Sequence, residues 1–156
     1  MLRTVIAFCA VFGVSISGIA AEVTYRKDIQ PLTVQKCSVC HGASAPYGGE
    51  FDENPKKFEA MLKGPRMDTY ADLVAFIVWP DTGAIMRRLD DGKSTSDRKP
   101  GNMYQNLGAT EEERQKNLNL FKEWVGKDAW KLNRWEARGK VPAITKEDLD
   151  KIKVKY

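Results

Sequence analysis

The segment Cys37-Ser38-Val39-Cys40-His41 decides what this chain of 156 residues folds around. It contains the only histidine of the sequence, and it holds both cysteines that lie beyond the N-terminal segment. Two thiols three positions apart, with an imidazole directly after the second, are typical of covalent haem attachment. The thiols add to the two vinyl groups of the haem, and the histidine ligates the iron. The motif therefore predicts one haem c held by Cys37 and Cys40, with His41 as an axial ligand.

Three other uses of the motif fit it less well. A structural zinc site needs four protein ligands, and this chain offers at most three of the cysteine and histidine type. A thioredoxin-like redox pair stands beside a βαβ pattern, which the surrounding sequence lacks. A structural disulfide across two intervening residues would be strained and would leave the histidine unexplained. Haem attachment is therefore the favoured interpretation.

The first 20 residues have the layout of a secretory signal peptide. Arg3 gives a short positive start, residues 5–16 form an uncharged apolar stretch, and Gly18-Ile19-Ala20 offers a small-residue cleavage site. The apolar stretch is shorter than the about 20 residues that a membrane span needs. An uncleaved N-terminal anchor is the alternative. We therefore predict export to the periplasm, an oxidising compartment, and no membrane span after cleavage.

Charge is distributed unevenly over the rest of the chain. Residues 21–126 hold 15 basic and 16 acidic side chains, whereas residues 127–156 hold 9 basic and 5 acidic ones. In residues 21–126 no basic patch interleaves with aromatic side chains, as it would in a nucleic-acid site, so we expect no nucleic acid as a partner. The basic tail is the main indication of how the protein contacts other molecules, although a solvated face of mixed charge would look the same.

Helical patterns dominate the sequence, and the alternation typical of strands is nearly absent. Residues 42–53 are rich in glycine and turn residues and are predicted to form a loop, and residues 90–107 are predicted to be irregular. The first predicted helix carries Ile29 and Leu32 and ends at the motif, and the second begins at Asn54-Pro55. The third is capped by Thr69, the fourth runs through Ile85 and Leu89, and the fifth runs from the capping box at Thr110 to Gly126. Two more are predicted in the tail, one over Asp128–Arg138 that ends at Gly139 and one capped by Thr145.

Over residues 23–126 this arrangement resembles the class I c-type cytochrome family. The stretch 25–32 before the motif resembles the entry helix of bacterial monohaem domains. The segment 85–89, the turn at Gly92, Met103 and the capped helix with a tryptophan resemble the later half of such domains. The resemblance implies an all-α fold around one covalently attached haem, with residues 127–156 as a C-terminal helical extension. It also implies that His41 is the proximal ligand and that a methionine from a late loop completes the iron.

The sixth position on the iron cannot be a second histidine, because the sequence has none. Met61 and Met86 lie on the apolar faces of predicted helices, where packing into the core is the expected role. Met103 lies in an irregular segment just before the last helix of the domain, which is where the methionine ligand falls in the family. We therefore predict Met103 as the distal ligand. Met67, Met86 and an open site remain alternatives.

Three aromatic side chains near these elements have two interpretations each. Trp124 is predicted to pack against the first helix rather than to contact the haem. Tyr104 and Trp79 could donate a hydrogen bond to a haem propionate, but burial on an amphipathic face is the expected role of both.

Ligation by histidine and methionine fills both axial positions, so no substrate can reach the metal. The expected function is therefore single-electron transfer between redox partner proteins, without catalysis. An iron with an open sixth position could instead bind peroxide, nitric oxide or carbon monoxide, and Arg66, Arg87 or Arg88 could polarise such a ligand. The third possibility is a subunit of a larger redox complex, docked to an acidic partner through residues 127–156.

Overall fold

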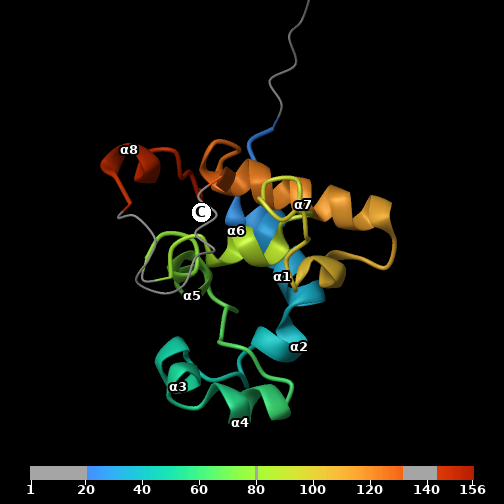
Figure 1. Cartoon of the computed structure of the whole chain (residues 1–156), viewed down its shortest axis with the longest axis vertical. Coiled ribbons are helices and arrows are strands. Elements are labelled where there is room, and N and C mark those ends of the chain that lie inside the picture. Colours follow the sequence, from blue (N-terminus) through green and yellow to red (C-terminus); the bar gives the residue numbers. More distant parts are fainter. Residues whose placement is uncertain (1–20, 80, 132–143) are drawn as a thin grey trace, which may run out of the picture.

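The computed structural model describes residues 21–79, 81–131 and 144–156, and every regular element among them is a helix. This confirms the predicted all-α fold. Figure 1 shows α2, α3 and α4 gathered at one end of the molecule, away from α7. We call residues 38–64 the haem-motif lobe and the other described residues the body. The elements are η1 (Tyr25–Ile29), α1 (Gln30–Lys36), α2 (Ser38–His41), α3 (Gly48–Glu53), α4 (Pro55–Ala60), α5 (Tyr70–Ala75), α6 (Ala84–Leu89), η2 (Tyr104–Leu107), α7 (Glu111–Val125), η3 (Ala129–Lys131) and α8 (Lys146–Leu149).

The first helix ends directly before the motif, as predicted, but it begins with one wide π turn, η1. In this wide turn the N–H of Gln30 donates a hydrogen bond to the carbonyl of Tyr25, five residues earlier. Pro31 follows in the next position, and its ring cannot sit over the carbonyl four residues earlier in a regular helix. The wider turn accommodates the proline, so η1 and α1 form one nearly continuous helix that leads into Cys37.

The core of the body is built on α7, which runs over the length that the capping signals predict. Thr110 accepts a hydrogen bond from the N–H of Glu113 at 3.2 Å, and Gly126 ends the helix with a φ of +105°. Only glycine adopts that conformation at little cost. The indole of Trp124 lies 6.1 Å from the ring of Tyr25 in η1, which confirms the predicted packing against the first helix. The buried side chains of α7 are Asn117, Leu118, Phe121, Trp124 and Val125.

The middle of the chain completes this core through α5 and α6. Thr69 caps α5 as predicted, and Met86 on α6 is fully buried, as expected of a packing methionine. The expected burial of Trp79 is wrong, because this side chain is 76% exposed. The helix ends at Ala75, so Trp79 lies beyond its apolar face.

The predicted loop over residues 42–53 is partly wrong, because its second half forms α3. The carboxylate of Glu50 accepts a hydrogen bond from the N–H of Tyr47 at 2.8 Å, and this bond stabilises the first turn despite its two glycines. The expected packing of Met61 is also wrong, since its side chain is 59% exposed. The chain leaves α4 at Met61, and Leu62 takes a left-handed φ of +55°, so neither residue continues the helix.

Residues beyond 126 contribute to the core of the body. Trp130 is buried, and its Nε1 donates a hydrogen bond to Oδ2 of Asp90 at 2.7 Å. At the end of the chain, the N–H of Val154 bonds to the carbonyl of Trp124, and the carbonyl of Lys155 accepts from the N–H of Tyr25. The cap of α8 by Thr145 is confirmed.

Some predicted features fall on residues that the structure does not describe. The signal peptide over residues 1–20 lies outside the described residues, as does most of the predicted helix over residues 128–138 with its stop at Gly139. In the described part of the chain, no helix combines the length and the apolar character that a bilayer crossing requires.

Candidate haem site

The two thiols of the motif are presented by one short helix. Cys37 caps α2, and its carbonyl accepts hydrogen bonds from the N–H of Cys40 at 3.2 Å and of His41 at 2.8 Å. Residues three apart in a helix lie on one face, so both sulfurs are presented together. Both cysteines are free thiols. The pair is therefore available for two thioether bonds.

The pKa of Cys37 argues against a redox dithiol. Burial, together with the nearby charge of Cys40, raises the pKa of the Cys37 thiol to about 11. A thioredoxin-like pair depends on a thiol with a lowered pKa, because the thiolate is the reactive form. A zinc site is disfavoured as well, since no group of three or more His, Cys, Asp or Glu side chains within the described residues could hold a metal ion.

The imidazole of His41 is held by a hydrogen bond through Nδ1, which leaves Nε2 free. Its Nδ1 donates a hydrogen bond to the carbonyl oxygen of Pro65 at 2.7 Å. A carbonyl can only accept, so the proton sits on Nδ1 and the lone pair of Nε2 remains for a metal. Burial lowers the pKa of His41; the bond to Pro65 opposes this and the charge of Arg88 adds to it. The imidazole is thereby kept neutral, which is the form that ligates iron.

The loop that holds His41 is fixed at three points. The N–H of Gly64 bonds to the carbonyl of Cys40 at 3.0 Å, and the N–H of Met67 bonds to the carbonyl of His41 at 2.9 Å. Between these bonds, Pro65 accepts from the imidazole. Gly64 presses against the ring so closely that a Cβ atom there would lie 2.2 Å from Cε1 of His41. As a sequence feature, Gly64-Pro65 indicates only the end of a helix, and its contact with His41 could not be predicted.

The methionines fall into distinct environments. Met86 is fully buried in the core and Met61 points to solvent. Met67 lines a shallow recess together with His41 and Cys37. The N–H of Met67 bonds to the carbonyl of His41 at 2.9 Å, so Met67 lies beside the motif.

Met103 is half-buried at the end of an irregular segment. The prediction that this segment extends to residue 107 is wrong at its end, because residues 104–107 form η2. Its N–H bonds to the carbonyl of Arg88 at 2.9 Å. The side chain of Arg88 is in turn near enough to His41 for its charge to lower the pKa of the imidazole. Tyr104, directly after Met103, is buried, and its hydroxyl donates to Glu111 at 2.5 Å.

Two of the three arginines that could polarise a ligand on an open iron, Arg66 and Arg87, have acidic partners. Arg66 donates to both carboxylate oxygens of Asp68, at 2.5 and 3.1 Å, and to the hydroxyl of Tyr47. Arg87 bonds to Asp81 at 2.7 Å. The guanidinium groups of Arg66 and Arg87 are therefore already engaged in ion pairs within the protein.

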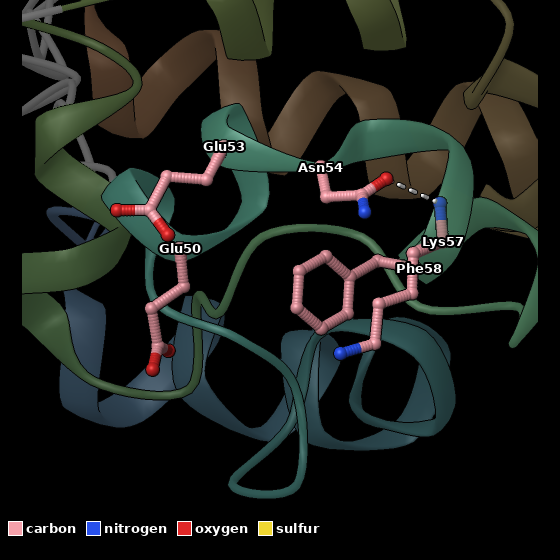
Figure 2. A pocket seen from close by; sticks show the side chains of 5 residues that line it. All are labelled: Glu50, Glu53, Asn54, Lys57 and Phe58. Carbon is pink, nitrogen blue, oxygen red and sulfur yellow. Dashed lines mark hydrogen bonds between the residues drawn. The ribbon is translucent and has the colours of Figure 1, made fainter.

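A second surface recess lies between α3 and α4 (Figure 2). The ring of Phe58 stands in its centre, with Glu50 and Glu53 on the side of α3. Asn54 joins the two helices, and its Oδ1 accepts from the N–H of Lys57 at 3.1 Å. This bond caps α4, so we interpret the recess as the seam of a helical hairpin and assign it no ligand.

Comparisons with known proteins identify a family for nearly all of the described chain. The family model described as PccH cytochrome c matches residues 24–156. A solved structure of the monohaem cytochrome PccH from Geobacter sulfurreducens is 55% identical, with a TM-score of 0.76, and the match covers 87% of this chain and 100% of that one. A search of curated proteins found no match.

Proposed function

Because the chain belongs to the PccH cytochrome c family, a family of monohaem c-type cytochromes, we propose that it carries single electrons between redox proteins in the periplasm. One haem c is bound covalently, and electron transfer is the general role of such proteins. We assign Cys37 and Cys40 to the thioether bonds, His41 to the proximal position and Met103 to the distal one.

The observation that carries this proposal is the hydrogen bond between His41 and Pro65 beside two free thiols. This bond fixes the tautomer that leaves Nε2 of His41 free. Because His41 directly follows Cys40 in the sequence, this nitrogen belongs to the residue next to an attachment point. Exported chains meet an oxidising compartment, and the predicted signal peptide supports that location.

Different residues of the site would have different roles in electron transfer. Pro65 and Gly64 hold the imidazole in one orientation, so that changing the charge of the iron does not require the ligand to move. Met103 would supply a soft thioether, which favours the ferrous form and raises the reduction potential relative to a second histidine. When bound, the haem supplies the one-electron couple. A site with both axial positions filled has no place for a substrate on the metal.

Absorption spectroscopy of the exported protein tests the ligand assignment. We expect a low-spin ferric spectrum with the weak near-infrared band of a sulfur–iron bond, and we expect Met103→Ala to lose that band. Met67→Ala is the matched control, because Met67 lines the recess beside Cys37 and His41 and is not the ligand that we assign. It should leave the band in place. A high-spin ferric spectrum of the unaltered protein, with rapid binding of carbon monoxide after reduction, would favour the open site instead.

The tail remains our proposal for the contact with an acidic partner. Residues 153–155 are hydrogen-bonded into the body, so deletion would also disturb the fold. Charge reversal at the exposed Lys146 and Lys153 is the better test. We expect weaker binding of the partner and a reduced dependence of binding on salt. Unchanged binding at low ionic strength would contradict a docking role.

A further inference from the structure

Asp90 is a buried residue at the end of α6, just before the irregular segment that leads to Met103. It is only 1% exposed. One carboxylate oxygen, Oδ1, accepts hydrogen bonds from the N–H of Gly92 at 2.7 Å and from the N–H of Ser94 at 3.2 Å. The other, Oδ2, accepts from Nε1 of Trp130 at 2.7 Å. A buried carboxyl group needs such partners, and here they join the start of the segment to a residue of the C-terminal extension.

The backbone of Asp90 holds the far end of the same segment. Its carbonyl accepts a hydrogen bond from the N–H of Gly101 at 2.8 Å, two residues before Met103. Gly101 lies so close to α6 that a Cβ atom there would be 2.3 Å from the carbonyl oxygen of Arg88. The N–H of Met103 bonds to that same carbonyl at 2.9 Å. Asp90 therefore closes residues 91–101 into a loop, and the chain leaves this loop toward Met103 at a fixed place.

The indole of Trp130 is fixed to α7 rather than to this loop. Trp130 is buried, and its backbone N–H bonds to the carbonyl of Gly126, at the end of α7, at 3.1 Å. Nζ of Lys122 in α7 lies 5.6 Å from the centre of the indole. The same Nζ lies 3.7 Å from Oδ1 of Asp91. The indole N–H is thus presented to the loop from α7 and η3.

We propose that Trp130 is a positioning residue that acts through Asp90 to keep the sulfur of Met103 on the iron. This inference rests on the proposed function, because it requires Met103 to be the distal ligand. The sulfur can leave the iron only if the chain before it shifts, and the bonds of Asp90 oppose that shift. Without the indole N–H, Oδ2 loses its partner and the carboxylate can rotate away from Gly92 and Ser94. Groups outside the ligand shell commonly hold metal ligands in place in this way.

Competition with imidazole measures how firmly Met103 is held. Imidazole added to the ferric protein displaces the methionine and abolishes the near-infrared sulfur–iron band. The variant Trp130→Phe keeps an aromatic ring and removes the donor. We expect it to retain the band in the absence of imidazole and to bind imidazole about tenfold more tightly, the order expected for one lost hydrogen bond to a carboxylate. We also expect the N–H groups of Gly92 and Ser94 to exchange with solvent faster than in the unaltered protein.

Trp124→Phe is the matched control. The indole of Trp124 is also fully buried, and it donates a hydrogen bond at 2.8 Å to the carbonyl of Lys155, near the end of the chain. We expect both variants to lower the free energy of unfolding, but only Trp130→Phe to change the affinity for imidazole. The affinity therefore separates a positioning role from a general loss of stability.

The outcomes separate this inference from the proposed function. If Met103→Ala removes the band but Trp130→Phe binds imidazole no more tightly than Trp124→Phe does, the role of Trp130 is overturned and the ligand assignment stands. Unchanged hydrogen exchange at Gly92 and Ser94 in Trp130→Phe would overturn it as well. If the unaltered protein has no sulfur–iron band, the ligand assignment and the role of Trp130 fall together.

Discussion

The body and the haem-motif lobe are held together in different ways. In the body, α7 alone buries five side chains, among them Phe121 and Trp124. In the lobe, α2, α3 and α4 bury none. Full burial of one large apolar side chain contributes about 1.5–3 kcal/mol to stability. The body therefore has a hydrophobic core of its own, and the helices of the lobe do not.

Hydrogen bonds to backbone carbonyls hold the residues of the lobe to one another instead. Nζ of Lys63 donates to the carbonyl of Val39 at 2.8 Å, and the N–H of Gly64 donates to the carbonyl of Cys40. The side chains of Val39 and Leu62 are 78% and 77% exposed. The comparison teaches that the fold is specified by the body, whereas the lobe presents the thiol of Cys40 and the imidazole of His41 directly after Cys37.

Matched leucine substitutions in the two regions should show the largest difference. We expect Leu118→Ala, at a fully buried site on α7, to lower the free energy of unfolding by about 2–5 kcal/mol. We expect Leu62→Ala in the lobe to change it by less than about 0.5 kcal/mol, because that side chain is in solvent. Denaturant unfolding of the haem-bound protein measures both values. Equal losses would mean that the lobe also has a hydrophobic core.

Matched glycine substitutions test the tight contact between Gly64 and the imidazole of His41. In Gly64→Ala the new methyl group would collide with the ring of His41, and we expect a loss of about 1–3 kcal/mol together with a perturbed haem spectrum. Gly49→Ala is the control, since nothing lies within 4 Å of a Cβ atom there. It should stabilise α3 by about 0.5–1 kcal/mol. An unaltered spectrum in Gly64→Ala would show that the imidazole is not held as described.

Much of the fold could be predicted from local signals. Thr69, Thr110 and Thr145 cap the helices that their spacing indicates, and Gly126 ends α7. One failure, the predicted loop over residues 42–53, came from glycines that nevertheless open a helix, α3. Two others came where a pattern of apolar residues was taken as a buried face. Trp79 and Met61 lie just beyond the ends of short helices, and periodicity cannot show where a short helix stops.

The site could be predicted only where its residues are adjacent in the sequence. Cys37, Cys40 and His41 form one motif, which the structure holds in a single helical turn, and the family implies one covalently bound haem. The partner of His41 is the carbonyl of Pro65, a backbone group 24 residues away. Every residue carries a backbone carbonyl, so the residue type does not show which carbonyl accepts a hydrogen bond. Nothing in the sequence beyond an isolated Gly-Pro pair could therefore have indicated the partner of His41.

The smallest expected effect concerns a carboxylate of the body, Asp91, and depends on pH. Burial alone would raise the pKa of Asp91, but hydrogen bonds from Lys93 and Gln115 and the charge of Lys122 outweigh it and lower the pKa from 3.8 to about 2. A carboxyl group with a lowered pKa in the folded state stabilises the protein above its unfolded pKa. That stabilisation is lost as the pH falls from about 4 to about 2, and it corresponds to about 2 kcal/mol at most.

We therefore expect Asp91→Asn to lower the free energy of unfolding at pH 7 and the difference from the unaltered protein to shrink as the pH approaches 2. Asp52→Asn on α3 of the lobe is the control. Its side chain is exposed, and we expect a change of less than about 0.5 kcal/mol at both pH values. Thermal or denaturant unfolding at several pH values between 2 and 7 measures the difference. A constant deficit for Asp91→Asn across that range would show that Asp91 acts through shape rather than charge, because protonation removes only the ionic part of its contacts with Lys93 and Lys122.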